Sequence, residues 1–333
     1  MIVSLRKIGE TMSKILFVID DVELKYFEWN DLVTDFWLIK EYLTRGDDVQ
    51  IAVKSGLFVK NGNARGMTYG AFWRDNNLFY EKDFCMRDIN DFDVVFFRPD
   101  PPVDVDYLNA CSVFDFVDKN KTKLINNPGQ IRCFNEKMHT HLFPKFVPDG
   151  IVTSKREIIL DFLSEKGNLV IKPLNRCFGS GVFKLVKGDF NVNAIIDNAT
   201  SNGKTAVCVQ EFLDNGGGDK RIFIIGDTIT DFSLRKLPGK GDFRFNTHGD
   251  DFFKADEVTN EEALAVKTVA KYLNAHEMPM CAVDVIDGKI TEINVTSPCY
   301  FIREVNKIFG INFENVIMRE LDKITDLRLL SRV

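Results

Sequence analysis

Short apolar runs alternate with amphipathic stretches in the first part of the chain. Residues 14–20 (KILFVID) predict a buried strand, which is followed by a helix over residues 32–45 and a strand over residues 49–53. A third strand over residues 94–98 ends at Asp-Pro-Pro, because proline cannot continue the ladder of hydrogen bonds. This alternation predicts an α/β unit with a mostly parallel sheet, whose binding crevice lies at the carboxyl ends of the strands.

The pattern changes after about residue 130, where short strands joined by glycine-containing turns dominate. Strands are predicted over residues 169–174, 182–186, 207–212, 221–225, 281–286 and 290–295. A helix is predicted over residues 261–273, with Asn260 as its N-cap and acidic residues in its first turn. This part of the chain therefore predicts an α+β arrangement.

Composition narrows the classes of function. The 333 residues are 45% hydrophobic, enough for two or three compact units with cores of their own. The formal charge of -6 disfavours non-specific attraction to nucleic acid or anionic membranes. The seven cysteines form no Cys-x-x-Cys pair, and no apolar run is long enough to cross a bilayer. We therefore expect a cytoplasmic protein with neither nucleic acid nor membrane as a partner.

The clearest chemical signal is the segment AVDVIDGKITEINVTSP, residues 282–298. It predicts two strands joined at Asp287-Gly288, where glycine can adopt the left-handed conformation of a tight turn. Asp284 and Glu292 are eight positions apart. An odd-length loop over residues 286–288, with a bulge at the glycine, would place both carboxylates on one face of the hairpin.

Asn294 shares that face, because alternate residues of a strand point the same way. Two carboxylates and an amide oxygen suit Mg²⁺, and the cluster lacks the histidine and cysteine ligands that zinc prefers. The alternative interpretation is that Asp284, Glu292 and Asn294 are solvated residues on an exposed hairpin face.

Segments upstream of the hairpin favour the metal site. Lys172 lies on a predicted strand before the glycine-bearing loop NRCFGSG, and such loops can cover phosphate oxygens with backbone amides. Lys137, in the sequence Asn-Glu-Lys, offers a second cation. The run Gln-Glu-Phe-Leu over residues 210–213 could present backbone groups to an adenine. Surface charge for Lys137 and a core strand for residues 210–213 are the alternative interpretations.

These motifs occur in a recognisable order. The sequences NEK, IKP, a glycine-bearing loop, QEFL, GDKR and EINVTSP resemble the ATP-grasp superfamily, and in detail the prokaryotic glutathione synthetases. The likeness runs from about residue 14 to about residue 321. It implies an ATP-grasp fold with an N-terminal Rossmann-like, pre-ATP-grasp domain over residues 1–130. A lid subdomain over residues 131–210 and a C-terminal subdomain with the metal site over residues 211–333 would follow.

The resemblance also implies a role for each matching residue. Asp284, Glu292 and Asn294 would bind two Mg²⁺ ions, with Mn²⁺ as a possible replacement, and Arg221, Arg235 and Arg303 would act in catalysis on the acyl acceptor side. The implied nucleotide-binding residues are Lys137, Lys172, Gly179, Ser180, Gly181, Gln210, Glu211, Phe212, Leu213 and Asp219.

The implied reaction joins γ-glutamylcysteine and glycine in a homo-oligomeric enzyme. ATP activates the cysteinyl carboxylate as an acyl phosphate, which the amine of glycine attacks to give glutathione, ADP and phosphate. Catalysis of this kind depends on positioning and charge stabilisation, so no cysteine is needed as a nucleophile.

Four segments depart from the family pattern. They are Pro99, the loop residues 176–178, the flap over residues 239–251, and residues 299–301, which make the link after Thr-Ser-Pro one residue longer. The changes gather at substrate-side loops while the nucleotide and metal residues remain. Two alternatives are therefore an ATP-grasp peptide or amino-acid ligase with altered substrates, and a non-catalytic nucleotide-binding regulator.

Overall fold

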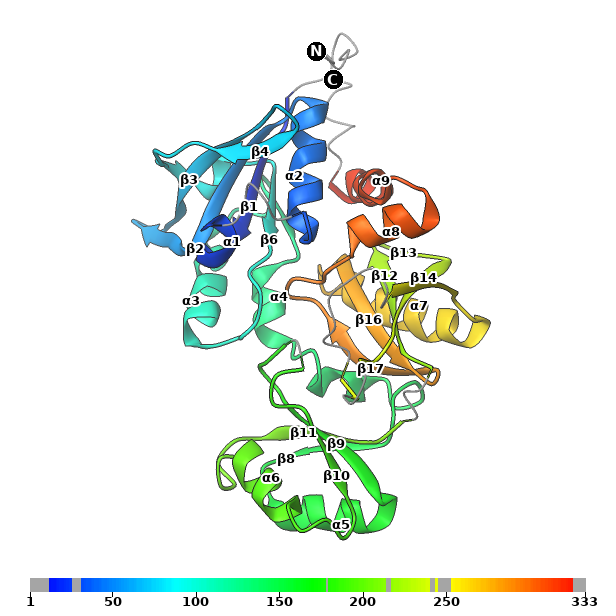
Figure 1. Cartoon of the computed structure of the whole chain (residues 1–333). Helices are drawn as coiled ribbons and strands as arrows, with labels where there is room; N and C mark the ends of the chain where they lie inside the picture. Colours follow the sequence, from blue (N-terminus) through cyan, green and yellow to red (C-terminus); the bar gives the residue numbers. More distant parts are fainter. Residues whose placement is uncertain are drawn as a thin grey trace.

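Three sheets organise the chain in the computed structural model, which describes residues 12–25, 31–177, 179–213, 217–239, 243–244 and 253–325 (Figure 1). Their strands fall within residues 14–125, 150–211 and 219–294. The domain limits predicted at residues 130 and 210 remain predictions. Among the described residues, no helix is long and apolar enough to span a membrane.

The first sheet has the strand order β4-β3-β2-β1-β6-β7, and β5 pairs with β3. Its centre is parallel, as predicted: β1 (Lys14–Ile19) lies between β2 (Asp48–Lys60) and β6 (Val94–Phe97), and β7 (Lys123–Ile125) pairs with β6. An antiparallel extension was not predicted, and it consists of β3 (Asn63–Arg74), β4 (Asn77–Tyr80) and β5 (Cys85–Asp88). The helices here are α1 (Asp21–Lys25), α2 (Thr34–Arg45), α3 (Val105–Val113) and α4 (Pro128–Cys133).

The second sheet is antiparallel and has the order β10-β9-β11-β8. Its strands are β8 (Gly150–Thr153), β9 (Asn168–Pro173), β10 (Phe183–Val186) and β11 (Val207–Glu211). Helices α5 (Arg156–Lys166) and α6 (Val192–Ala199) cover one face (Figure 1). Their apolar residues, such as Ile159 and Ile196, pack on Leu169 and Ile171 in a core separate from the rest of the protein. We call this unit, residues 150–211, the lid.

The third sheet has the order β15-β14-β12-β16-β17, and β13 pairs with β12. Its strands are β12 (Asp219–Ile225), β13 (Thr228–Ile229), β14 (Phe232–Lys236), β15 (Phe253–Glu257), β16 (Met280–Ile286) and β17 (Lys289–Asn294). Helices α7 (Asn260–Ala275), α8 (Ile302–Phe309) and α9 (Phe313–Thr325) complete the unit. The predicted N-cap of α7 was wrong by one residue. Thr259 is the cap, because its hydroxyl accepts from the Glu262 amide at 3.2 Å while the Glu262 carboxylate accepts from the Thr259 amide at 2.9 Å.

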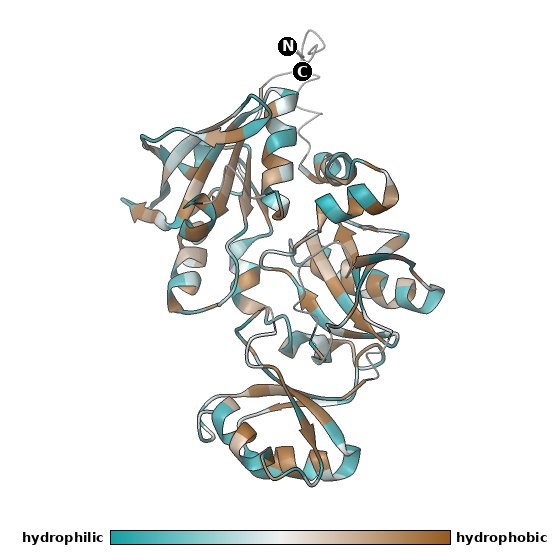
Figure 2. Cartoon of the chain, viewed as in Figure 1, coloured by the Kyte–Doolittle hydropathy of each residue, from teal (hydrophilic) through white to brown (hydrophobic). Residues whose placement is uncertain are grey.

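The first and third sheets share their cores. One apolar cluster joins Phe17 and Phe96 of the first sheet to Phe223 and Tyr300 of the C-terminal unit. In Figure 2 the apolar positions concentrate on the strands, and the polar positions on the outer sides of helices. The shared cores fix the first and third sheets against each other, whereas the lid has its own core.

Asn126 fastens this junction with buried hydrogen bonds. It follows β7, and its side-chain amide donates to the carbonyl oxygens of Met280 and Val295, both at 2.8 Å. Its amide oxygen accepts from the Met280 amide at 2.8 Å. Asn126 is only 2% exposed, so removal of its side chain would leave buried backbone groups without partners.

We predict that Asn126→Ala lowers the free energy of unfolding by about 3 kcal/mol, because buried polar groups lose their hydrogen bonds. Urea denaturation followed by circular dichroism measures this. The control is Asn193→Ala, an exposed position on α6, which should stay within about 0.5 kcal/mol of the wild type. Equal stability of the two variants would contradict the assigned role of Asn126.

Candidate active site

A cavity of about 650 Å³ lies where the three sheets meet. Lys172 and Gln210 line it from the lid, and Asp284 and Glu292 line it from the third sheet. Arg98 is among the residues that line it from the unit built around the first sheet. Clefts of this size between units are where small molecules commonly bind. The cavity also lies at the carboxyl ends of β1 and β6, as the parallel pattern predicted.

The hairpin of β16 and β17 brings its carboxylates to one face. Asp284 and Glu292 are direct cross-strand partners, and both line the cavity. The predicted position of the bulge was wrong. The loop consists only of Asp287 and Gly288, both with positive φ, and the extra residue is Thr291, because Val285 pairs with Ile290 while Asp284 pairs with Glu292.

Arg221 holds Asp284 through two parallel hydrogen bonds. Nε and Nη2 of Arg221 lie 2.7 Å from Oδ1 and Oδ2 of Asp284. Burial raises the pKa of Asp284, but the attraction of Arg221 outweighs it and holds that pKa well below its ordinary value. Asn294 Nδ2 adds a contact to Asp284 Oδ2 at 3.2 Å, so its amide nitrogen is engaged within the hairpin.

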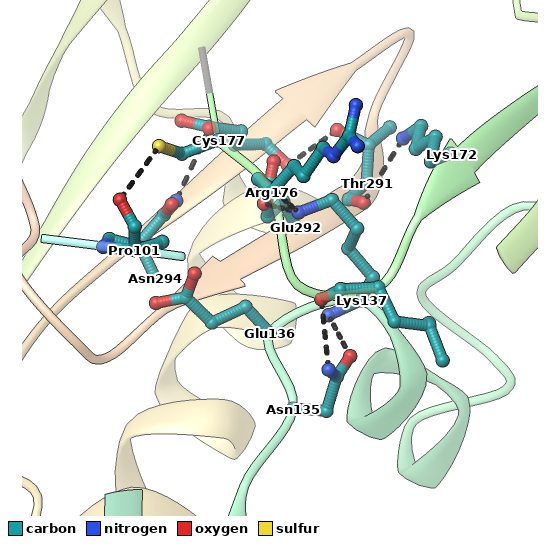
Figure 3. Close-up of polar contacts among 12 residues, drawn as sticks. Pro101, Asn135, Glu136, Lys137, Lys172, Arg176, Cys177, Thr291, Glu292 and Asn294 are labelled. Atoms are coloured by element: carbon teal, nitrogen blue, oxygen red, sulfur yellow. Dashed lines mark hydrogen bonds and ion pairs between the residues drawn. The ribbon is translucent and has the colours of Figure 1, made fainter. Parts of the chain in front are cut away.

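Lys137 pairs with the second carboxylate of the hairpin. Its ammonium lies 2.7 Å from Glu292 Oε1 and 2.7 Å from the carbonyl oxygen of Arg176, in the glycine-bearing loop (Figure 3). Burial lowers the pKa of Lys137, but the charges of Glu292 and Glu136 outweigh burial, and the pKa is raised. Lys137 is therefore a buried cation between the loop and the hairpin, and it does not itself line the cavity.

The neighbouring Glu136 anchors this segment, a role that the sequence did not indicate. Its Oε1 accepts from the amides of Val295 and Thr296, at 2.7 and 2.9 Å, and from the Thr296 hydroxyl at 3.0 Å. Glu136 thus fixes the position of Lys137 relative to the end of β17. The motif Asn-Glu-Lys drew attention to this segment, but it does not indicate that Glu136 bonds to Val295 and Thr296.

The lid presents its polar groups to the cavity along β9 and β11. Lys172 Nζ lies 2.8 Å from Gln210 Oε1 and 3.4 Å from the carbonyl oxygen of Thr291. Gln210 Nε2 is buried without a hydrogen-bond partner. Glu211, Phe212 and Leu213 also line the cavity, but the amides of Glu211 and Phe212 already donate to carbonyl oxygens of Asp149 and Asn168.

The glycine-bearing loop reaches the cavity through Cys177 and Gly179, whereas Ser180 and Gly181 do not line it. Gly181 has a positive φ, and a Cβ there would lie 2.8 Å from Pro173 Cγ, so the loop needs glycine at this point. Phe178 lies outside the described residues, as does the predicted flap except for Gly239, Phe243 and Arg244. Phe243 and Arg244 line the cavity.

The three predicted arginines differ in position. Arg221 and Arg303 line the cavity, and Arg303 also pairs with Glu304 Oε1 at 2.8 Å. Arg235 does not line the cavity. Its side chain lies on the opposite face of the sheet, beside its cross-strand partner Lys220, and it forms an ion pair with Asp256 there. Lys236 lines the cavity in its place. The structure thus places Lys236, and not the predicted Arg235, at the cavity wall.

Asp219 and Lys236 form a buried ion pair at the cavity wall. Lys236 Nζ lies 2.7 Å from Asp219 Oδ2, and the two residues are cross-strand partners. Burial raises the pKa of Asp219 to about 6, although Lys236 acts in the opposite direction. Asp219 Oδ1 is buried without a hydrogen-bond partner.

The hairpin fits a hard divalent cation. Asp284 and Glu292 offer carboxylate oxygens. The side-chain nitrogen of Asn294 donates to Asp284, so the amide oxygen of Asn294 can point to a ligand. The described residues contain no cluster of three or more histidine, cysteine or acidic side chains placed to hold a metal ion. A cation at the hairpin would therefore need further oxygen ligands from phosphate or water, as Mg²⁺ commonly does.

Two family models match most of the chain. The model described as the N-terminal domain of prokaryotic glutathione synthetase matches residues 13–132, and the model of its ATP-grasp domain matches residues 136–310. Glutathione synthetase of Vibrio parahaemolyticus is 31% identical over 293 residues, which cover 87% of this chain and 92% of that protein. The glutathione synthetase of Neisseria meningitidis is 29% identical over 306 residues, which cover 90% and 95%.

Solved structures with similar folds include a synthetase and ligases. D-cycloserine synthetase DcsG superposes with a TM-score of 0.65 at 15% identity, covering 93% of this chain and 99% of that chain. VanG D-Ala:D-Ser ligase of Enterococcus faecalis has a TM-score of 0.56 at 15% identity, with coverage of 93% and 99%. The ATP-grasp ligase PsnB, with Mg and ADP, has a TM-score of 0.57 at 14% identity and covers 97% and 100%. The predicted ATP-grasp fold is confirmed.

The contrast between Lys236 and Arg235 can be tested without a substrate. We predict that Lys236→Met raises the pKa of Asp219 above about 6 by at least about one unit, while Arg235→Met leaves it unchanged, because only Lys236 pairs with this carboxylate. Carbon-detected NMR titration of the carboxyl group measures the pKa. Equal shifts in the two variants would contradict the assigned faces of β14.

The free energy of unfolding should depend on pH, because the pKa of Asp219 is raised in the folded protein. Folded Asp219 binds its proton more tightly than in the unfolded chain, so stability is lost as pH rises from about 4 to about 6. In Lys236→Met this loss should extend to higher pH, and urea unfolding between pH 5 and 8 would measure it.

Proposed function

The chain belongs to the prokaryotic glutathione synthetase family, and on this premise we propose that it is an ATP-dependent carboxylate-amine ligase that makes glutathione. The observation that carries the proposal is the cavity of about 650 Å³, in which Lys172 of the lid faces the hairpin of Asp284 and Glu292. The proposed acid substrate is γ-glutamylcysteine, the proposed amine is glycine, and ATP is the phosphoryl donor.

Lid residues support a nucleotide site. Lys172 can exchange its contact with Gln210 for phosphate oxygens, and Gln210 Nε2 is a buried donor that still needs an acceptor. Glu211, Phe212 and Leu213 follow on the cavity wall, where an adenine could lie along the strand. Lys137 already contacts the glycine-bearing loop and Glu292, so it can move from the carboxylate to phosphate over a short path.

Asp284, Glu292 and Asn294 would hold the magnesium ions, which we propose to be two, with Mn²⁺ as a substitute. Bound there, Mg²⁺ would neutralise charge on the triphosphate and on the phosphoryl group in transfer. The ion pairs with Arg221 and Lys137 orient both hairpin carboxylates in the protein without ligand. With the carboxylates engaged by a metal ion, Arg221 and Lys137 would be able to turn toward the anionic reactants.

Arg221, Lys236 and Arg303 support an acyl acceptor site beside the hairpin. All three line the cavity and carry positive charge that suits a carboxylate or an acyl phosphate. In the proposed reaction a cysteinyl carboxylate oxygen attacks the γ-phosphorus as the bond to ADP breaks. The glycine nitrogen then attacks the acyl carbon, and phosphate leaves with the proton that the amine gives up. Homo-oligomerisation and a cytoplasmic location stay predictions.

The decisive experiment measures the release of ADP by the purified protein. We predict ADP formation that requires Mg²⁺, γ-glutamylcysteine and glycine together, with glutathione formed in equal amount, because the acyl phosphate is consumed only by the amine. A coupled assay for ADP and chromatography of thiols measure both products. Turnover no higher with both substrates than with either alone would contradict glutathione synthesis.

A matched pair of hairpin variants tests the metal ligands. We predict that Glu292→Gln lowers kcat by about 100-fold or more, because the amide cannot neutralise Mg²⁺ at the phosphoryl group. Asp287→Asn changes an exposed acid in the turn of the same hairpin, and asparagine tolerates its positive φ. Its kcat should stay within about twofold of the wild type. Similar losses in both variants would show that the hairpin fold, not the carboxylate at 292, matters.

A further inference from the structure

Residues 299–301 lie directly before helix α8, in a segment that departs from the family pattern. Cys299 and Phe301 both line the cavity. Tyr300, between them, is fully buried in the apolar core that joins the first and third sheets. This segment therefore has one residue inside the core and a cavity-lining residue on either side of it.

Tyr300 anchors the segment to three other parts of the chain. Its backbone amide donates to the hydroxyl of Thr34, in the first turn of α2, at 2.8 Å. Its own hydroxyl lies 2.5 Å from the carbonyl oxygen of Ile224 on β12 and 2.9 Å from that of Cys281 on β16. Because these contacts are buried, they fix where the residues next to Tyr300 can go.

Phe301 has a backbone conformation that is unfavourable for its residue type. Its φ is 47° and its ψ is 45°, in the left-handed region, and in the described part of the chain it is the only aromatic residue with a positive φ. A bulky side chain seldom adopts this conformation, whereas glycine or asparagine does so readily. Such a conformation persists where the surroundings enforce it, and it is found most often at functional sites.

This conformation places the ring of Phe301 against Arg221. The central carbon of the guanidinium lies 5.2 Å from the ring centroid, and the ring itself packs on Phe253, with 5.0 Å between centroids. Arg221 Nη1 also donates to the carbonyl oxygen of Cys299 at 3.2 Å. The segment thus contacts Arg221 twice, in addition to the two hydrogen bonds that Arg221 makes with Asp284.

We propose that Phe301 is a positioning residue, whose ring holds the guanidinium of Arg221 at the cavity wall. The catalytic consequence rests on the proposed function, in which Arg221 serves the acyl acceptor side. The face of an aromatic ring attracts a cation without requiring one hydrogen-bond direction. The guanidinium can therefore turn from Asp284 toward an anionic reactant while the ring still supports it. Leucine would fill similar space without this attraction.

The position of Arg221 can be measured without any substrate. In NMR spectra of the isotope-labelled protein, the Nε proton of Arg221 should exchange slowly with water, because it is bonded to Asp284 and the ring covers the guanidinium. Phe301→Leu should speed this exchange by about tenfold or more, since leucine does not attract the cation. Phe301→Tyr keeps an aromatic ring and should keep the wild-type exchange rate.

Kinetics link Phe301 to the proposed reaction. In the assay of ADP formation, Phe301→Leu should lower kcat by about tenfold and leave the KM for ATP within about twofold, because the ring contacts Arg221 while the nucleotide is assigned to the lid. Phe301→Tyr should retain the wild-type kcat. Phe301→Asn separates the ring from the backbone, because asparagine adopts the left-handed conformation without strain. It should lose as much activity as Phe301→Leu, and it replaces that variant if Phe301→Leu does not fold.

The control is Phe190→Leu, the same side-chain change at a fully exposed position of the lid, which should alter neither measurement. Wild-type exchange of the Arg221 proton in Phe301→Leu would overturn the proposal, and so would equal losses in Phe301→Tyr and Phe301→Leu. If Phe301→Leu speeds the exchange but the wild-type protein forms no ADP, the positioning of Arg221 is supported and the proposed function is contradicted.

Discussion

Two carboxylates placed side by side in a buried site constrain the whole active-site region. Asp284 and Glu292 face the same cavity as cross-strand partners, and two like charges so placed repel each other unless cations compensate them. Compensation comes from Arg221 on the neighbouring strand and from Lys137, far away in sequence. Lys137 in turn depends on Glu136, whose bonds to Val295 and Thr296 fix this segment against β17. The charges that prepare the hairpin therefore also join the segments that surround it.

The same arrangement links the fold to the proposed chemistry. The first and third sheets share cores, whereas the lid has a core of its own and meets them at the cavity. Lys172 of the lid reaches the carbonyl oxygen of Thr291, the residue at the bulge of β17. A ligand that binds both the lid and the hairpin would replace contacts that already hold the two together.

Local patterns predicted many of the elements and the shared face of Asp284 and Glu292, but not the antiparallel extension of β3, β4 and β5 or the registers between strands. The eight-residue spacing of Asp284 and Glu292 predicted a shared face, although the bulge lies at Thr291 and not at the glycine. Arg235 and Lys236 are adjacent in sequence, and only the pairing of β14 with β12 decides which of them reaches the cavity. Glu23, Asp35 and Asp100 line the same cavity from three separate segments, so no local motif could indicate that they come together. The register of each strand depends on its pairing with other segments of the chain, and the periodicity of one segment does not specify that pairing.

We propose that Lys137 and Arg221 hold the hairpin carboxylates in place for a magnesium nucleotide. A crystal structure with Mg²⁺ and a non-hydrolysable ATP analogue would show whether they do. We predict metal density bridging Asp284, Glu292 and phosphate oxygens, with the ammonium of Lys137 turned from Glu292 to phosphate. A nucleotide bound elsewhere, with the pairs of Lys137 with Glu292 and of Arg221 with Asp284 intact, would contradict the account.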